Sequence, residues 1–154
     1  MADIAPLPAG AWAEAYAVHA ASFAPEAADF LSPHSFAALA AEENVLLLGA
    51  REAKAWVGYI LLRVAADEAE ILSLAVNPKA RKQGLGKKLV MAAIAAVRGR
   101  GVEKIFLEVS PANAAALSAY RAAGFQACGV RKAYYRPKSG EIEDALTMVF
   151  RPVN

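Results

Sequence analysis

The sequence predicts an α+β fold with a mixed, mostly antiparallel central sheet flanked by helices. Apolar, strand-like runs at 45–50, 55–64 and 69–76 are separated by short polar turns, a spacing typical of an antiparallel meander. A helical pattern over 84–98 then precedes another strand at 104–109. We therefore expect this fourth strand to lie parallel to the third, connected to it by a right-handed crossover.

Two helices are expected before the meander. Residues 7–23 carry apolar and aromatic side chains at spacings of three and four, which is typical of a helix face turned to the core. The members of this stripe are Trp12, Tyr16, His19 and Phe23. Ser32 followed by Pro33 resembles a helix N-cap with proline at the first helical position, so a second short helix should run to about residue 41.

The C-terminal part continues the alternation of helices and strands. Ser110-Pro111 repeats the cap-plus-proline signal and is expected to open a helix over 112–122. Two further strands are expected at 125–135 and 142–150, joined by a turn around 137–140 where proline and glycine gather. No repeat or linker interrupts the chain, so we expect one domain over 1–154.

Composition excludes several classes of protein. A net charge of +2 is too small to argue for nucleic-acid binding, and no apolar run reaches the roughly 20 residues that a membrane-spanning helix needs. The first residues lack the basic segment of a secretory signal. Cys128 is the only cysteine, and His19 and His34 offer no metal-ligand spacing, so we expect no internal disulfide and no metal. These features favour a cytoplasmic monomer that binds neither nucleic acid nor membrane.

The stretch between the third strand and the 84–98 helix has the form of a phosphate-binding loop. Gly84 and Gly86 stand at the helix start, where unsatisfied N–H groups and partial positive charge attract phosphate oxygens. A Walker loop would need glycine in place of Arg81, and a dinucleotide fingerprint would need a small residue in place of Leu89. The remaining pattern is Arg-x-x-Gly-x-Gly with lysines around it.

Two further signals follow this loop. Glu108 interrupts an apolar strand on the same face as Phe106, so its carboxylate must either be paired, for example with an arginine, or open onto a cleft. Asn113, Tyr120 and Gly124 then recur in the order Asn-x-x-Ala-x-x-x-Tyr-x-x-x-Gly-Phe. On its own, Tyr120 could equally be a core aromatic of its helix.

Together these motifs resemble the GNAT N-acetyltransferase superfamily, and within it the RimI-type ribosomal-protein-alanine N-acetyltransferases. The resemblance covers residues 70–150 through LAVNP, RKQGLG and FLEVSPANAAALSAYRAAGF, whereas residues 1–43 carry little of it. It implies a GNAT-type sheet whose parallel strand pair splays apart at an acetyl-CoA site.

The resemblance also implies roles for individual residues. Glu108 would be the general base, acting through water, and Tyr120 the acid that protonates the coenzyme A sulfur; Glu70 is a rival base, as in the histone-acetyltransferase branch. The residues expected to bind acetyl-CoA are Leu74, Ala75, Val76, Arg81, Gln83, Gly84, Leu85, Gly86, Lys87, Lys88, Asn113 and Tyr120. Those expected to shape the acceptor groove are Arg131, Tyr134 and Tyr135; their alternative is an exposed hairpin.

The expected function is acetyl transfer from acetyl-CoA to a protein N-terminal α-amine, such as the alanine of a small-subunit ribosomal protein. An α-amine has a pKa of about 8 and a lysine about 10.4, so a single distant glutamate favours the former. Two alternatives stay open: acetylation of a lysine or a small-molecule amine, and a non-catalytic acyl-CoA-binding module.

Overall fold

A computed structural model describes residues 2–8, 10–25, 27, 30–81, 84–135 and 143–152. Its strands join one sheet in the order β1-β2-β3-β4-β5-β7-β6, and every neighbouring pair is antiparallel except β4 and β5. The strands are β1 Asp3–Pro6, β2 Val45–Glu52, β3 Ala55–Ala65, β4 Glu68–Val76, β5 Lys104–Val109, β6 Gln126–Tyr135 and β7 Glu143–Phe150. The predicted mostly antiparallel sheet with one parallel pair is confirmed.

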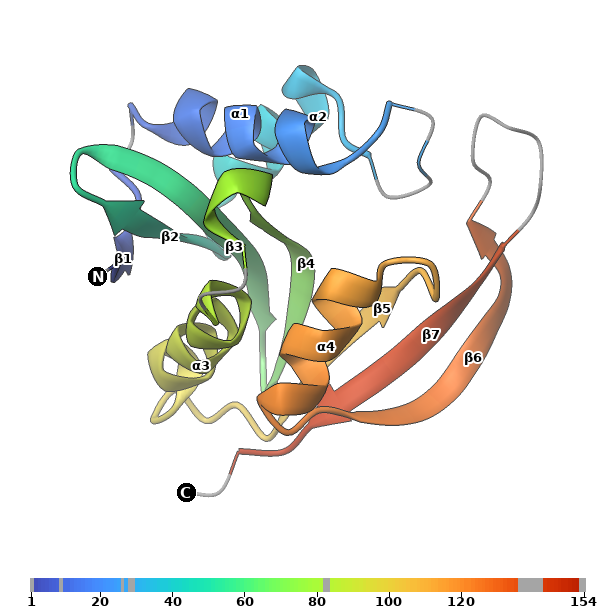
Figure 1. The fold of residues 1–154 in the computed structure, drawn as a ribbon. Coiled ribbons are helices and arrows are strands. Elements are labelled where there is room, and N and C mark those ends of the chain that lie inside the picture. The colour runs from blue at the N-terminus through green and yellow to red at the C-terminus, as the bar shows by residue number, and fades with distance from the viewer. Residues whose placement is uncertain are drawn as a thin grey trace.

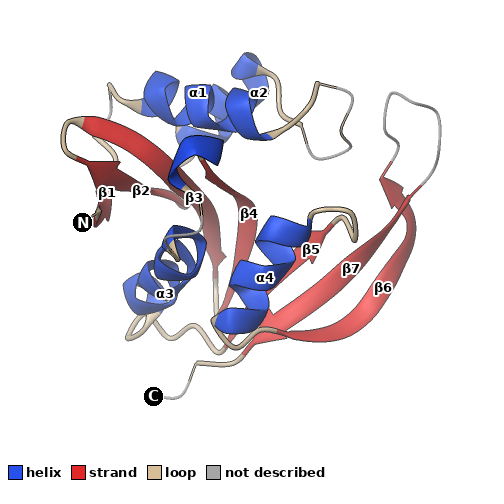
Figure 2. Cartoon of the chain, in the orientation of Figure 1, coloured by secondary structure: helices blue, strands red, loops and turns tan. Residues whose placement is uncertain are grey.

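Helices cover both faces of this sheet (Figures 1 and 2). They are α1 Trp12–Ser22, α2 Pro33–Ala40, α3 Leu85–Val97 and α4 Ala114–Ala122, with a 3₁₀ turn at Pro78–Ala80. The two faces alternate along β3: Tyr59 and Leu61 are buried beneath α1 and α2, whereas Ile60 and Leu62 are buried against α3 on the other side. The core therefore has two layers, separated by the sheet.

The start of the chain differs from the sequence prediction. Residues 3–6 form the edge strand β1, paired antiparallel with β2, and the predicted helix over 7–23 begins only at Trp12. Pro6, Pro8 and Gly10 disfavour helix in the preceding segment, and proline is tolerated on an edge strand because its missing N–H is not needed by a second neighbour. Four residues are too few to show a strand periodicity in the sequence.

The two proline-containing helix starts have different outcomes. Ser32 is the predicted cap of α2: its Oγ accepts a hydrogen bond from Ser35 N at 3.1 Å, and Pro33 follows it. The predicted cap at Ser110 is wrong, because Asn113 caps α4. Ser110 Oγ instead accepts from Ala112 N at 3.2 Å, and this local turn delays the helix by two residues.

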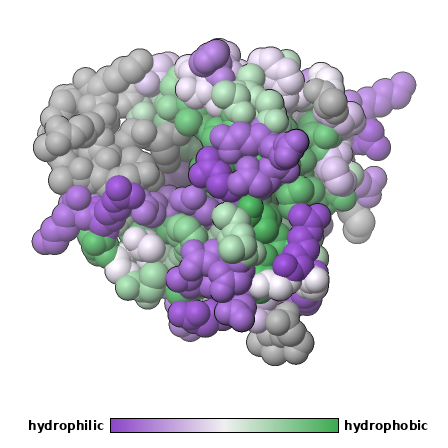
Figure 3. Space-filling model, turned by 180° about the vertical axis from the view of Figure 1, so that it is seen from behind, coloured by the Kyte–Doolittle hydropathy of each residue, from purple (hydrophilic) through white to green (hydrophobic). Residues whose placement is uncertain are grey.

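Surface polarity is mixed over the described residues. Seen from behind, hydrophilic and hydrophobic side chains intermingle on the visible face (Figure 3). Within the described ranges, none of the helices combines the length and apolar character needed to cross a membrane. The turn expected at 137–140 lies outside the described residues.

Candidate active site

The parallel strands β4 and β5 diverge towards their C-terminal ends. Their register runs from Glu68 opposite Lys104 to Ile71 opposite Leu107, but β4 continues to Val76. A bulge at Leu72 coincides with the divergence, since β3 residues 61 and 62 face residues 73 and 71. The structure thus contains the predicted splayed pair, at the point where β4 bends.

The free half of β4 presents backbone groups to this gap. Asn77 N donates to Val57 O of β3 at 2.7 Å, and backbone orientation alternates along an antiparallel strand. Leu74 and Val76 therefore turn their N–H and C=O groups towards the β5 side, while those of Ala75 face β3. Of the three strand residues predicted to bind the cofactor, two have the required orientation.

The carbonyl of Val76 already has side-chain partners. Arg81 Nε donates to Val76 O at 3.1 Å, and Ser22 Oγ of α1 lies 3.2 Å from the same oxygen. Arg81 is solvent-exposed, and its guanidinium thus ties the loop back to the end of β4. Lys82 and the predicted contact Gln83 lie outside the described residues.

The start of α3 has the geometry of an anion seat. Gly84 is the N-cap with a φ of 72°, and a Cβ placed there would meet nothing within 4 Å. Leu85, Gly86 and Lys87 have no preceding helical carbonyl for their amides. Lys88 N donates to Gly84 O at 3.1 Å, so this predicted donor is used inside the helix and only its exposed ammonium is left.

Gly86 has a further reason to be glycine besides the one expected. A Cβ at this position would come within 3.0 Å of Ala119 Cβ on α4. The sequence predicts both glycines as part of a phosphate-binding loop, and that role stays a prediction. In addition, Gly86 allows α3 and α4 to pack together.

Helix α4 carries the predicted acid and the predicted amide. Tyr120 is 4% exposed within the core cluster that includes α3, and its ring centroid lies 5.8 Å from that of Phe125. Its phenol is therefore held by packing, and its role as an acid stays a prediction. Asn113 Oδ1 accepts from Ala116 N at 3.2 Å, so the oxygen of this predicted cofactor contact caps the helix.

Two carboxylates on adjacent strands face the side of the sheet that α1 and α2 cover further along. Glu108 accepts hydrogen bonds from Arg131 Nη1 at 3.1 and 3.3 Å, with side-chain exposures of 18% and 57% respectively. Glu70 lies 3.7 Å from Arg63 Nη1. Arg131 is thus the arginine partner that the sequence left open for Glu108, and the predicted base and a predicted acceptor contact are brought together.

The rival base, Glu70, has a perturbed environment. Burial raises the pKa of Glu70 above its usual value, and the nearby charge of Glu108 raises it further. The guanidinium groups of Arg63 and Arg131 act in the opposite direction. A carboxylate with a raised pKa holds a proton more readily, so this face contains two carboxylates in unlike surroundings.

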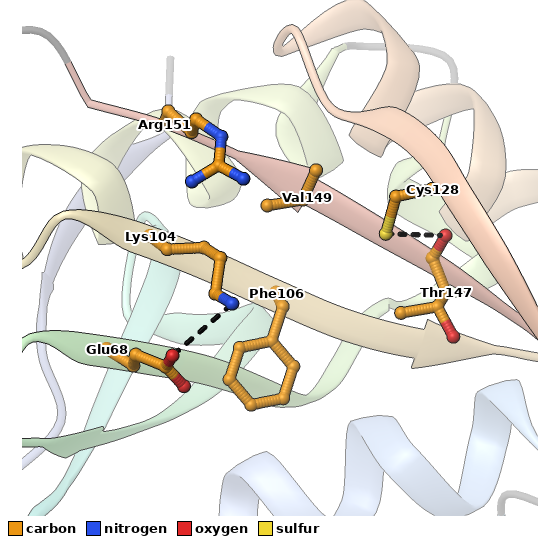
Figure 4. Close-up of a pocket in the computed structure, with 7 residues that line it drawn as sticks. All are labelled: Glu68, Lys104, Phe106, Cys128, Thr147, Val149 and Arg151. Atoms are coloured by element: carbon orange, nitrogen blue, oxygen red, sulfur yellow. Dashed lines mark hydrogen bonds and ion pairs between the residues drawn. The ribbon is translucent and has the colours of Figure 1, made fainter.

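A small pocket continues the same face towards the starts of these strands (Figure 4). Its volume is about 220 Å³, and Phe106 and Thr147 place it next to the carboxylates, because they pair with Glu70 and Glu108 in the sheet register. It is lined by Glu68, Lys104, Phe106, Cys128, Thr147, Val149 and Arg151. Lys104 Nζ and Glu68 Oε1 lie 3.3 Å apart at its rim. Nothing in the sequence pattern indicated this pocket.

The remaining predicted acceptor residues lie at the end of β6. The backbone of Tyr135 pairs with that of Glu143, which continues the β6–β7 hairpin past Arg131. The side chains of Tyr134 and Tyr135 are not among the described ones, so their part in an acceptor groove stays a prediction.

A splayed parallel pair beside a glycine-capped helix start that suits an anion defines a class of α+β proteins. Residues 11–125 match the model of the acetyltransferase (GNAT) family. The chain belongs to this family, whose members use acetyl-CoA.

Individual relatives narrow the comparison. The chain is 38% identical over 90 residues to the [ribosomal protein bS18]-alanine N-acetyltransferase of Escherichia coli K12, an alignment that spans 58% of this chain and only 60% of that relative. The crystal structure of the Escherichia coli ribosomal-protein-S18-alanine N-acetyltransferase superposes with a TM-score of 0.85 at 30% identity, covering 98% of this chain and 94% of that one. The PaiA N-acetyltransferase of Thermoplasma acidophilum, solved in complex with coenzyme A, shares the fold with a TM-score of 0.72 at 20% identity, covering 99% of each chain.

Proposed function

We infer that this chain transfers the acetyl group of acetyl-CoA to the α-amine of a protein N-terminus, with the alanine of a small-subunit ribosomal protein as the leading candidate acceptor. The observation that carries this function is the splay between β4 and β5 beside the glycine-capped start of α3. The likeness to the Escherichia coli alanine N-acetyltransferase supports the choice of acceptor.

The described residues fit acetyl-CoA at two points. The open space in front of Gly84 and the amides of Leu85 to Lys87 suit the diphosphate, with the exposed ammonium groups of Lys87 and Lys88 nearby. The gap-facing backbone of Leu74 and the N–H of Val76 suit the amides of the pantetheine arm, and an N–H group there can polarise the thioester carbonyl. Acetyl-CoA supplies an acetyl group already activated as a thioester.

The two side chains proposed for acyl transfer come from opposite faces of the sheet, Glu108 from β5 and Tyr120 from the core cluster shared with α3. Glu108, acting through water, takes the proton that the attacking amine loses as the C–N bond forms. Tyr120 donates its proton to the sulfur as the C–S bond breaks. The amine is thereby acetylated and coenzyme A leaves as the thiol, without a covalent acyl-enzyme. Cys128 lies outside the motifs of the cofactor site, and its Sγ lies 3.5 Å from Thr147 O, so it is not assigned a part in this transfer.

Isotope-labelled acetyl-CoA tests the assignment of the acceptor. The purified protein is incubated with labelled acetyl-CoA and a cell extract, and labelled peptides and metabolites are identified by mass spectrometry. Label on α-amines of protein N-termini is expected, with alanine ahead of other first residues. Label on lysines or small amines would replace the proposed acceptor, and coenzyme A binding without any transfer would indicate a non-catalytic module.

A further inference from the structure

A histidine with no part in the proposed chemistry is completely buried under the acceptor side of the sheet. His19 of α1 is 0% exposed and lies among aromatic rings, with Phe23 the nearest at 4.6 Å between centroids. Its Nε2 accepts a hydrogen bond from Leu31 N at 2.8 Å. Since a backbone amide can only donate, Nε2 carries no proton, and the neutral ring has its proton on Nδ1.

The proton on Nδ1 begins a polar chain that crosses from the helix to the sheet. His19 Nδ1 lies 2.6 Å from Tyr59 Oη on β3, and that oxygen lies 2.8 Å from Ser73 Oγ on β4. Tyr59 is also 0% exposed. Apolar side chains could fill the same space without the cost of removing polar groups from water. Directional hydrogen bonds, in contrast, define the positions of α1, β3 and β4 relative to one another.

This chain reaches β4 where the strand leaves its parallel neighbour. Ser73 follows the bulge at Leu72 and precedes the gap-facing backbone of Leu74. Helix α1 holds the other end of the same free half, because Ser22 Oγ lies 3.2 Å from Val76 O and 2.7 Å from Val18 O of its own helix. Both ends of the diverging segment are thus tied to α1, which lies over β3 and β4 (Figure 1).

We propose that His19, Tyr59 and Ser73 form a positioning network that sets the distance between the α1 wall and the free half of β4, and thereby aligns the acceptor amine with the thioester. The inference rests on the proposed acetyl transfer. The diphosphate seat at α3 lies on the opposite face of the sheet and has no residue in this network. Loss of the network should therefore lower use of the acceptor by a clearly larger factor than coenzyme A affinity, because it shifts the backbone of Leu74 proposed for the pantetheine arm but leaves the diphosphate site at α3 in place.

Tyr59→Phe tests this role, and Tyr16→Phe is its matched control. Tyr16 Oη donates to Leu31 O at 3.0 Å, so its loss removes one hydrogen bond from the same wall without touching β4. For Tyr59→Phe we expect kcat/KM for an N-terminal alanine peptide to fall about tenfold or more, because small misplacements of bound groups reduce rates strongly. Coenzyme A affinity by calorimetry should stay within about twofold of wild type, as should both parameters in Tyr16→Phe.

A second variant and a direct readout keep the test decisive. Ser73→Ala removes the last hydroxyl of the network from a partly exposed site and should lower kcat/KM as Tyr59→Phe does. It takes the place of Tyr59→Phe in the test if Tyr59→Phe folds poorly. Nitrogen NMR of the wild type should show His19 neutral and protonated on Nδ1 at neutral pH. Equal peptide kinetics in Tyr59→Phe, Ser73→Ala and wild type, a parallel loss of coenzyme A affinity, or the other tautomer would overturn the network. Absence of transfer by the wild type would instead overturn the proposed function, and with it this role.

Discussion

The two faces of the sheet handle polar groups in opposite ways. On the α3 side, most inward residues are aliphatic, and apart from the Tyr120 phenol the polar groups offered to a cofactor belong to backbone at the start of α3 and the free half of β4. On the α1 side, the polar groups are side chains: the buried His19 and Tyr59, and the paired carboxylates Glu70 and Glu108. In the proposed reaction, acetyl-CoA is therefore held mainly by main chain on one face, and the acceptor is bound by side chains on the other.

The largest effect should come from the charged side of this comparison. Glu108→Gln keeps the shape of the side chain but removes the carboxylate that accepts both Arg131 contacts, and turnover should fall by about 10²–10⁴-fold, the usual contribution of a general base. A thiol-release assay with a peptide acceptor measures it. The control is Glu68→Gln: Glu68 lies on the same face of the sheet as Glu108 but pairs with Lys104, so this variant should keep wild-type turnover. Equal turnover in the two variants would remove Glu108 from the mechanism.

Tyr120 tests the opposite face of the sheet. Tyr120→Phe keeps the packing against Phe125 and removes only the hydroxyl group, so turnover should fall within the same range of about 10²–10⁴-fold while coenzyme A binding persists. Single-turnover kinetics with acetyl-CoA separate the chemical step from product release. A wild-type chemical step would leave Tyr120 as a core aromatic.

Acidification should lower the contribution that the buried His19 of α1 makes to the free energy of unfolding. Burial lowers the pKa of His19 from 6.5 to about 4, so the unfolded chain binds a proton in this interval and the folded one does not. This contribution to stability is complete above the unfolded pKa and falls as the pH drops, by about 2 kcal/mol between pH 7 and pH 5. Urea unfolding gives the free energy of unfolding of wild type and His19→Gln at both pH values, and the wild type should lose about 2 kcal/mol more than the variant between pH 7 and pH 5. An equal loss in the two proteins would contradict a buried neutral histidine.

Overpacking at the helix contact should disturb the α3 side. Gly86→Val pushes methyl groups against Ala119, and a well-packed contact of this kind loses about 1–3 kcal/mol when enlarged. Adding Ala119→Gly should recover part of the loss, and the coupling from a double-mutant cycle in chemical denaturation is the quantity to compare. Additive effects would show that the two positions do not limit one another.

The smallest effect is expected from the exposed ion pairs. Arg63 lies 3.4 Å from Glu42 and 3.7 Å from Glu70, with partly exposed side chains on each partner. A double-mutant cycle of Arg63→Met and Glu42→Gln should give a coupling below about 1 kcal/mol that shrinks further in salt. A larger coupling would show that the ion pair between Arg63 and Glu42 stabilises the fold more than an exposed pair does.

Patterns confined to one element were predicted well from the sequence. The apolar face of α3, the strands β2 to β5 and the Ser32 cap follow from local periodicity and side-chain chemistry. The predicted Ser110 cap failed because a competing turn and Asn113 act within the same few residues. Cytoplasmic location, a monomeric state and the absence of nucleic-acid and membrane partners stay predictions.

The pairing of whole strands was predicted, but individual side-chain contacts between distant elements were not. His19 and Tyr59 are 40 residues apart, and the helical periodicity identified His19 only as a member of a core stripe. Arg131 meets Glu108 across β7 because the strand order places β7 between β5 and β6, an arrangement that no local pattern encodes. The same holds for Gly86, whose neighbour Ala119 belongs to another helix.

The contact between Gly86 and Ala119 helps to set the distance between the two parts of the proposed cofactor site. Gly86 is the second residue of α3, and Ala119 immediately precedes Tyr120 on α4. The distance from the start of α3 to the Tyr120 phenol therefore depends on how α3 packs against α4, as well as on the segments that connect the two helices. A longer connection between α3 and α4 would leave this helix contact unchanged, whereas a single methyl group added at Gly86 would push the two helices apart and move Tyr120 away from the start of α3.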